Sequence, residues 1–300
     1  MPDHLSSPDP MVRTTQPPHQ GQRSVRETEF FVESGSSFRV RNRLAMQDIA
    51  DGLKLMRLGC TLGLLDIKGR YRGSMLGPFW MTLSTAVMVL ALGLLYSQLL
   101  GQTVAQFLPY LSLSLVLWGF LQNIIQDGCA VFTSSEGMIR AVRMPFFVHA
   151  TRSIIRNLVI LAHNMLVFIA VFAFFRIWPG EAVFGAIPAL LLWLIDGYAL
   201  TIMMGILCAR FRDVPPIVSN LVQIGFYITP IIWKPEQLLY GRDYLPLNPF
   251  YAMLAVLRDP ILGLTPNWQV WTSALIYSTL LCIGSWFLFA RVRGRIAFWI

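Results

Sequence analysis

Charged side chains are scarce in this 300-residue sequence, since Asp, Glu, Lys and Arg make up only 13% of it. Soluble proteins usually contain about 25% of these residues. Hydrophobic residues make up 55% of the chain, and they come in long unbroken runs. An element with one face in water would instead space them at helical or strand intervals. The composition therefore excludes an ordinary soluble domain and indicates a membrane protein.

Lysine is almost absent, and this excludes one route to ATP. None of the three lysines, Lys54, Lys68 and Lys234, follows a glycine as the lysine of a phosphate-binding loop does. The sequence also lacks HExxH, CxxC, GxSxG and GxGxxG patterns, and two of its four histidines, His4 and His19, stand near the N-terminus. We therefore expect no catalytic residue, no metal site and no bound cofactor on this chain.

Cysteines are few and scattered, which excludes a disulfide framework or a zinc cluster. The four are Cys60, Cys129, Cys208 and Cys282. The net charge of +8 would suit nucleic acid, but the basic residues stand beside the ends of apolar runs, so no nucleic-acid partner is expected. The first 40 residues are rich in Pro, Ser and Gln without the apolar core of a signal peptide, so 1–40 is predicted to be a disordered cytoplasmic tail.

Six segments are apolar enough to cross the hydrocarbon layer, which takes about 20 residues of helix. These predicted spans are 79–100, 107–125, 158–175, 186–209, 216–233 and 268–290. The fifth contains Pro230 and two amides, so we expect it to be broken or to face the bundle.

Five polar residues fall inside these spans, and such residues are functional candidates. They are His163, Asn164, Asp196, Asn220 and Gln223. The alternative for His163 and Asp196 is a structural hydrogen bond between neighbouring helices.

The positive charges are distributed very unevenly between the predicted loops. If the chain crosses six times, 20 of its 24 Lys and Arg residues share one side with both termini. Cytoplasmic loops carry an excess of these residues. The sequence therefore predicts that the N-terminus and the C-terminus both lie in the cytoplasm.

Three further segments are neither spans nor simple loops. Residues 49–65 are predicted to form an amphipathic helix along the cytoplasmic face, the alternative being a helix of a small cytoplasmic domain. The basic loop 134–156 is expected to hold a short amphipathic helix or only a surface turn. The outer loop 234–267 has five prolines and apolar runs too short to cross, which favours re-entrant or interface-lying helices.

Five segments, in order, resemble the permeases of ABC-2 type polysaccharide exporters for O-antigen, capsule and teichoic acid. They are DIKGRYRGSMLGPFW at 66–80, IRAVRMP at 139–145, ARFRDV at 209–214, ITPIIW at 228–233, and LNPF at 247–250 with Arg258-Asp259 after it. The resemblance covers the chain from about Leu58 to its end.

The resemblance implies a fold and partners. It implies an all-α membrane protein with six transmembrane helices per protomer, an interface or gate region at 41–78 and a transmembrane domain at 79–300. It also implies a homodimer in the inner membrane, a separate ATPase subunit that carries ATP and Mg, and a lipid-linked polysaccharide as substrate.

The resemblance also implies roles for particular residues. It places an ATPase-coupling loop at Glu136, Gly137, Met138, Ile139, Arg140 and Pro145. It places a cytoplasmic mouth for the lipid head group at Lys68, Arg70, Tyr71 and Arg72, and a second cytoplasmic loop at Arg210, Arg212 and Asp213. Channel-lining aromatic side chains would be Trp80, Tyr110 and Trp118.

Two alternatives remain open. One is an ABC-2 exporter of a small molecule such as a drug or haem. The other is a membrane-embedded acyltransferase that uses His163 and Asp196.

Overall fold

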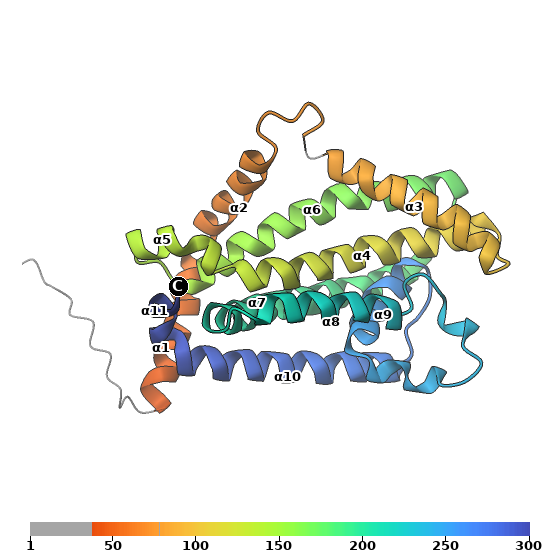
Figure 1. The fold of residues 1–300 in the computed structure, drawn as a ribbon. Helices are drawn as coiled ribbons and strands as arrows, with labels where there is room; N and C mark the ends of the chain where they lie inside the picture. The colour runs from red at the N-terminus through yellow and green to blue at the C-terminus, as the bar shows by residue number, and fades with distance from the viewer. Residues whose placement is uncertain (1–37, 78) are drawn as a thin grey trace, which may run out of the picture. The chain divides into compact units, whose positions relative to one another are not determined.

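The computed structural model describes residues 38–77 and 79–300, and all regular structure in these ranges is helical (Figure 1). The α-helices are α1 Phe38–Lys54, α2 Met56–Arg70, α3 Phe79–Leu99, α4 Val104–Ala130, α5 Glu136–Ala141, α6 Phe146–Phe175, α7 Ala186–Arg210, α8 Val214–Ile228, α9 Pro249–Ile261, α10 Trp268–Val292 and α11 Ile296–Trp299. Short 3-10 turns are η1 Thr133–Ser135, η2 Gly180–Gly185, η3 Pro235–Gln237, η4 Arg242–Leu247 and η5 Arg293–Arg295. The all-α prediction is confirmed for these ranges. The predicted tail lies outside them, apart from its last three residues, which begin α1.

Five helices are long and apolar enough to cross a membrane: α3, α4, α6, α7 and α10. The shortest of them, α3, has 21 residues, which at 1.5 Å per residue covers the hydrocarbon thickness of about 30 Å. They coincide with the first four predicted spans and the last. The chain is therefore a multi-pass membrane protein.

The fifth predicted span, 216–233, is only partly helical. Its helix, α8, has 15 residues, or about 22 Å, and is too short to cross alone. The helix stops at Thr229, whose backbone is extended, because the residue before a proline avoids the helical region and Pro230 follows.

Two boundaries differ from the sequence prediction. The third span begins at Phe146 and not at 158, so the predicted loop 134–156 is shorter and its basic residues Arg152 and Arg156 lie on α6. The helix predicted at 49–65 is divided at Leu55, where α1 ends and α2 begins. Both helices contact α6.

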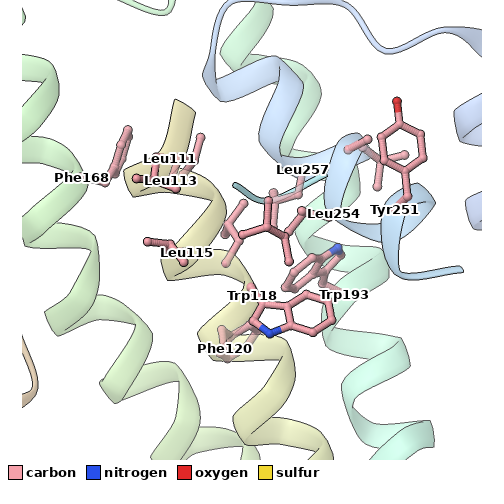
Figure 2. Close-up of a cluster of buried hydrophobic side chains, with 14 of the residues drawn as sticks. Leu111, Leu113, Leu115, Trp118, Phe120, Phe168, Trp193, Tyr251, Leu254 and Leu257 are labelled. Atoms are coloured by element: carbon pink, nitrogen blue, oxygen red, sulfur yellow. The ribbon is translucent and has the colours of Figure 1, made fainter. Parts of the chain in front are cut away.

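The main hydrophobic core surrounds α4, which contacts α3, α6, α7, α8 and α9. Most of its side chains are buried, including Leu111, Leu113 and Trp118. Figure 2 shows Trp118 and Trp193 of α7 lying together beside leucines of α9. The indole nitrogen of Trp193 donates to the Met253 carbonyl at 2.8 Å, so a polar atom of this buried ring is satisfied.

The outer loop contains one true helix, α9, and it packs into the core. Asn248 caps it, because its side-chain oxygen accepts from the Phe250 backbone N–H at 3.0 Å, and Pro249 occupies the first turn. Ala252, Leu254, Ala255 and Val256 are fully buried. Burial against α4, α7 and α10 therefore explains the apolar run that sequence reasoning assigned to the outer loop.

Candidate functional site

A closed network of charges joins α2, α4 and α6 near one end of the bundle. Arg152 Nη2 lies 2.6 Å from Asp66 Oδ1, and Arg152 Nε lies 2.7 Å from Asp66 Oδ2. Arg156 bridges Asp66 at 3.1 Å and Asp127 at 2.8 Å, and Asn157 donates to Asp127 at 2.9 Å. Two cations and two carboxylates thus neutralise each other with charge-assisted hydrogen bonds, which offsets the cost of two arginines in a helix that is otherwise apolar enough to cross a membrane.

This network lowers the pKa of the Asp66 carboxyl. Burial alone would raise its pKa, but the hydrogen bonds and positive charges of Arg152 and Arg156 outweigh burial, so the pKa lies below its ordinary value. The carboxylate is therefore held ionised.

Two glycines allow α2 to lie directly on α6. A Cβ at Gly59 would come within 2.8 Å of the Thr151 side chain, and one at Gly63 within 2.7 Å of the Arg152 carbonyl oxygen. Their spacing of four residues places both on one face of the helix. Small residues are thus required for the contact that brings Asp66 to its arginines.

The predicted mouth residues follow directly after this contact. Lys68, Arg70 and Arg72 are exposed and Tyr71 is half-buried, at the end of α2. Three exposed positive charges therefore lie close together at this end of α2.

The predicted coupling loop is mostly the short helix α5. Glu136, Gly137 and Arg140 are exposed, and Met138, Ile139 and Pro145 are half-buried. Glu136 and Arg140 form an ion pair at 2.9 Å. Arg140 also donates to the Ile300 carbonyl, which places α5 beside the C-terminal segment. The exposed residues of α5 form a face that no other part of the described chain covers.

The second predicted cytoplasmic loop lies beside the same segment. Arg210, Arg212 and Asp213 are all exposed. The Arg210 guanidinium lies 5.3 Å from the centre of the Trp299 ring, a distance suited to cation–π attraction. Loop 210–213, α5 and α11 therefore form one surface at one end of the molecule (Figure 1).

A cavity lined by amide side chains opens on the outside of the helix bundle, and we call it the amide groove. A cavity of about 270 Å³ is lined by Met88 of α3, Gln122 and Gln126 of α4, and Ser219, Gln223 and Phe226 of α8. Gln126 donates to Ser219 at 3.3 Å.

The amide groove cannot face lipid tails without cost. Gln122, Gln126, Asn220 and Gln223 are exposed, and hydrocarbon offers no hydrogen-bond partner for an amide. The groove lies toward the end of α4 that holds Asp127. This face of α4 and α8 therefore adjoins water or another protein surface.

The three predicted channel aromatics have different positions. Trp80 is 57% exposed on α3, whereas Tyr110 and Trp118 are buried inside the protomer. Trp118 packs against Phe226 and Phe250 with ring centres 5.8 and 5.5 Å apart. Of the three, Trp80 is therefore exposed on the outside of the protomer, whereas Tyr110 reaches only the wall of a cavity and Trp118 packs in the core.

The intramembrane residues of the third and fourth predicted spans join helices. The Thr85 hydroxyl donates to Asn164 at 3.3 Å, and Thr82 donates to the His163 carbonyl at 3.1 Å, so both tie α3 to α6. The His163 ring nitrogen Nδ1 lies 2.8 Å from the Val159 carbonyl of its own helix.

Asp196 has a different partner, since it accepts from the Ser278 hydroxyl of α10 at 2.5 Å. Among the described residues, no contact joins His163 to Asp196. The pair that an acyltransferase would need is not formed.

Arg258 belongs to one of the five motifs, but its contacts were not predicted from the sequence. It is 1% exposed, and its guanidinium donates to the Pro230 carbonyl at 2.6 Å, to the Tyr110 hydroxyl at 2.9 Å and to Asp259 at 3.1 Å. The arginine thus ties α9 to α4 and to the turn at Pro230.

Spacing in the sequence offered a signal for some of the missed residues. Arg152 and Arg156, like Gln122 and Gln126, are four residues apart, so each pair shares a helix face. No comparable signal marked Asp127, whose partner Arg156 is distant in the sequence.

Comparisons with known proteins identify the family of this chain. Residues 60–262 match the ABC-2 type transporter family. The chain is 26% identical over 193 residues to an O-antigen export system permease protein of Myxococcus xanthus, covering 63% of this chain and 74% of that protein. It is 20% identical over 237 residues to one of Klebsiella pneumoniae, covering 77% and 90%. Because the family match spans more than half of a chain that crosses the membrane several times, this protein belongs to the ABC-2 type transporters, as a permease and not an enzyme.

Proposed function

We propose that this chain is the permease subunit of an ABC exporter that moves a lipid-linked polysaccharide across the inner membrane. The observation that carries the proposal is the amide groove on α4 and α8. Sugar hydroxyls need hydrogen-bond partners throughout the hydrocarbon layer, and amides supply both donors and acceptors. The names of the relatives, which are O-antigen export permeases, point to the same substrate class.

The proposal includes a homodimer. The groove opens on the outside of one protomer, where lipid would leave its amides unsatisfied. A second copy facing it would enclose a polar path between the protomers. Exposed apolar side chains on the same helix, such as Ile217, Leu221 and Ile224, would be covered by that contact.

The proposed topology has six crossings, with both termini in the cytoplasm. Five crossings alone would leave the two ends of the chain on opposite faces of the membrane. Asp48 of α1, however, lies 2.9 Å from Arg293 after α10, which favours an even number of crossings. The sixth would be α8 together with the buried helix α9, whose polar backbone is covered by protein as a re-entrant segment requires. Helices α1 and α2 would lie at the cytoplasmic surface.

The energy would come from a separate ATPase subunit that holds ATP and Mg. The chain has no lysine placed as in a phosphate-binding loop. The exposed face of α5 and the neighbouring loop at Arg210 offer a docking surface at the proposed cytoplasmic end. The basic cluster Lys68, Arg70 and Arg72 would receive the phosphate-bearing head of the substrate at the same end.

A bulky residue at position 137 tests the proposal. A side chain at Gly137 would meet nothing within 4 Å in this chain, so Gly137→Trp should fold but obstruct a partner on α5. We expect the variant to insert normally, to lose co-purification of the ATPase and to leave polysaccharide inside a permease-deletion strain. Gly284→Trp is the matched control, because Gly284 is also exposed, helical and free of neighbours within 4 Å, and it belongs to α10 and not to α5 or the basic cluster.

The outcomes separate clearly. Restored surface polysaccharide with wild type and Gly284→Trp, but not with Gly137→Trp, supports the exporter. A deletion strain with normal surface polysaccharide would exclude the proposed substrate. ATPase binding retained by Gly137→Trp would exclude α5 as the coupling element.

A further inference from the structure

A cavity of about 910 Å³ opens at the opposite end of the bundle from the mouth, and we call it the outer cavity. Its walls come from the start of α4, the end of α6, the loop after α8, and α9. Its volume falls at the upper end of the range for small-molecule sites, about 300–1,000 Å³. It therefore has room for more than one sugar ring.

The charges in the outer cavity do not balance. Arg258 is paired with Asp259 at 3.1 Å, and Arg242 with Glu236 at 3.5 Å. Lys234 has no carboxylate within salt-bridge distance among the described residues. Its ammonium group donates to the Gln106 carbonyl at 3.2 Å and lies 5.6 Å from the centre of the Tyr110 ring.

The surroundings of Lys234 favour an anionic ligand. Burial lowers the pKa of its ammonium group, with Glu236 opposing that shift, so a negative group brought close would be stabilised by a poorly hydrated cation. An ammonium has three donors, and the Gln106 carbonyl takes one of them. Lys234 therefore supplies an incompletely satisfied positive charge to the cavity.

Other groups in the wall suit the rest of a sugar. Thr265 and Asn267 line the cavity with a hydroxyl and an amide. Tyr251 also lines it, and Figure 2 shows its hydroxyl pointing away from the hydrophobic cluster on which its ring rests. Leu262, Pro266 and other apolar residues of the wall offer a surface for the C–H face of a ring.

We infer that the outer cavity binds a sugar unit bearing one carboxylate, with Lys234 at the carboxylate and the Tyr251 hydroxyl among the groups that bind its hydroxyls. The inference rests on the proposed function, because that function brings a polysaccharide to this end of the protein. The polysaccharide would then contact the protein at the outer cavity as well as along the path through the membrane, and this contact would favour acidic sugars.

Binding to the purified permease in lipid nanodiscs tests the inference. The probes are a trisaccharide of hexuronate units, a neutral trihexose and inorganic phosphate, each titrated calorimetrically. Wild type should bind the acidic trisaccharide at least about tenfold more tightly than the neutral one, because hydrogen bonds to charged groups are the stronger ones. The preference should shrink as salt is added.

Three variants assign the effect to the cavity. Lys234→Met should abolish the preference for the acidic trisaccharide, and Lys234→Arg should retain it. Arg176→Gln removes a positive charge from an exposed position that does not line the cavity, so it should change nothing. Thermal unfolding of each variant shows whether it has folded.

Three results would overturn the inference: equal affinity of wild type for the acidic and neutral trisaccharides, an unchanged preference in folded Lys234→Met, or phosphate binding as tight as the acidic trisaccharide. The last would indicate a general anion site. Restoration of surface polysaccharide by wild type in the deletion strain is scored separately, so failure of the cavity and failure of the exporter assignment are distinguishable.

Discussion

Asp66 is the residue on which the charge network of α2, α4 and α6 converges, because two arginines of α6 share its carboxylate. Asp66→Asn would leave Arg152 and Arg156 adjacent with one carboxylate between them. We expect the free energy of unfolding to fall by about 1–3 kcal/mol, which is below the range for fully buried pairs because the side chains are partly exposed. Thermal unfolding in nanodiscs measures it.

The pH dependence of this loss follows from the pKa of Asp66, which lies below the ordinary value of 3.8. The stabilisation should be complete above about pH 4 and should disappear as the pH falls through the lower, folded-state pKa. Asp51→Asn is the control, because the Asp51–Lys54 pair is exposed and should contribute little. Equal shifts in the two variants would contradict the role assigned to the network.

The exposed arginines after Asp66 have a different role, since they face outward. Each basic residue near anionic lipid contributes about 1 kcal/mol of attraction. Replacing Arg70 and Arg72 by Glu should sharply reduce polysaccharide export while leaving thermal stability unchanged. Arg295→Glu, a charge reversal at another exposed position, should have little effect. Unchanged export in the double variant would exclude the proposed mouth.

At the scale of elements, the contact between α2 and α6 depends on Gly63. A larger side chain there would collide with the Arg152 carbonyl oxygen, which backbone cannot easily move away from. Gly63→Leu should therefore separate the helices, withdraw Asp66 from its arginines and lower the unfolding temperature by at least as much as Asp66→Asn. Gly69→Leu, with open space around it, should be neutral. A stable Gly63→Leu variant would show that α2 does not need this close approach.

The sequence predicted the long spans well and the short or charged elements poorly. Unbroken apolar runs identify α3, α4, α7 and α10 because lipid requires them. The start of α6 was placed 12 residues too late, since Arg152 and Arg156 lower the local hydropathy and their partners Asp66 and Asp127 are distant in the sequence. The packing of α9 could not be predicted from local sequence for a similar reason, because two of the groups that bind Arg258 come from α4 and from Pro230.

The candidate site shows the same limit. The exposed basic cluster at Lys68 and the surface of α5 lie on short local segments that a sequence motif can mark. The amide groove requires α4 and α8 to lie together, and the burial of Tyr110 and Trp118 within the protomer also depends on tertiary contacts. Tertiary contact, and not local sequence, decided which side chains reach a surface.

At the scale of the whole molecule, the contact of Asp48 with Arg293 predicts that the first and last helices meet on one side of the membrane. Reporter fusions at Arg140 and at Arg293 should therefore both be active as cytoplasmic reporters, and a fusion at Arg242 should report the outer side. Cytoplasmic activity at Arg140 with outer activity at Arg293 would contradict the six-crossing topology and remove the ATPase docking surface.

Helix α6 has 30 residues, about 45 Å, and contains neither glycine nor proline. It begins shortly after α5, and Phe172 near its other end lines the outer cavity. Because glycine and proline are common causes of kinks, a tilt imposed on α6 beside α5 would displace Phe172 and with it the wall of the outer cavity. Movement of the proposed ATPase at one end of α6 and binding of a sugar at the other end would then be coupled through a single helix.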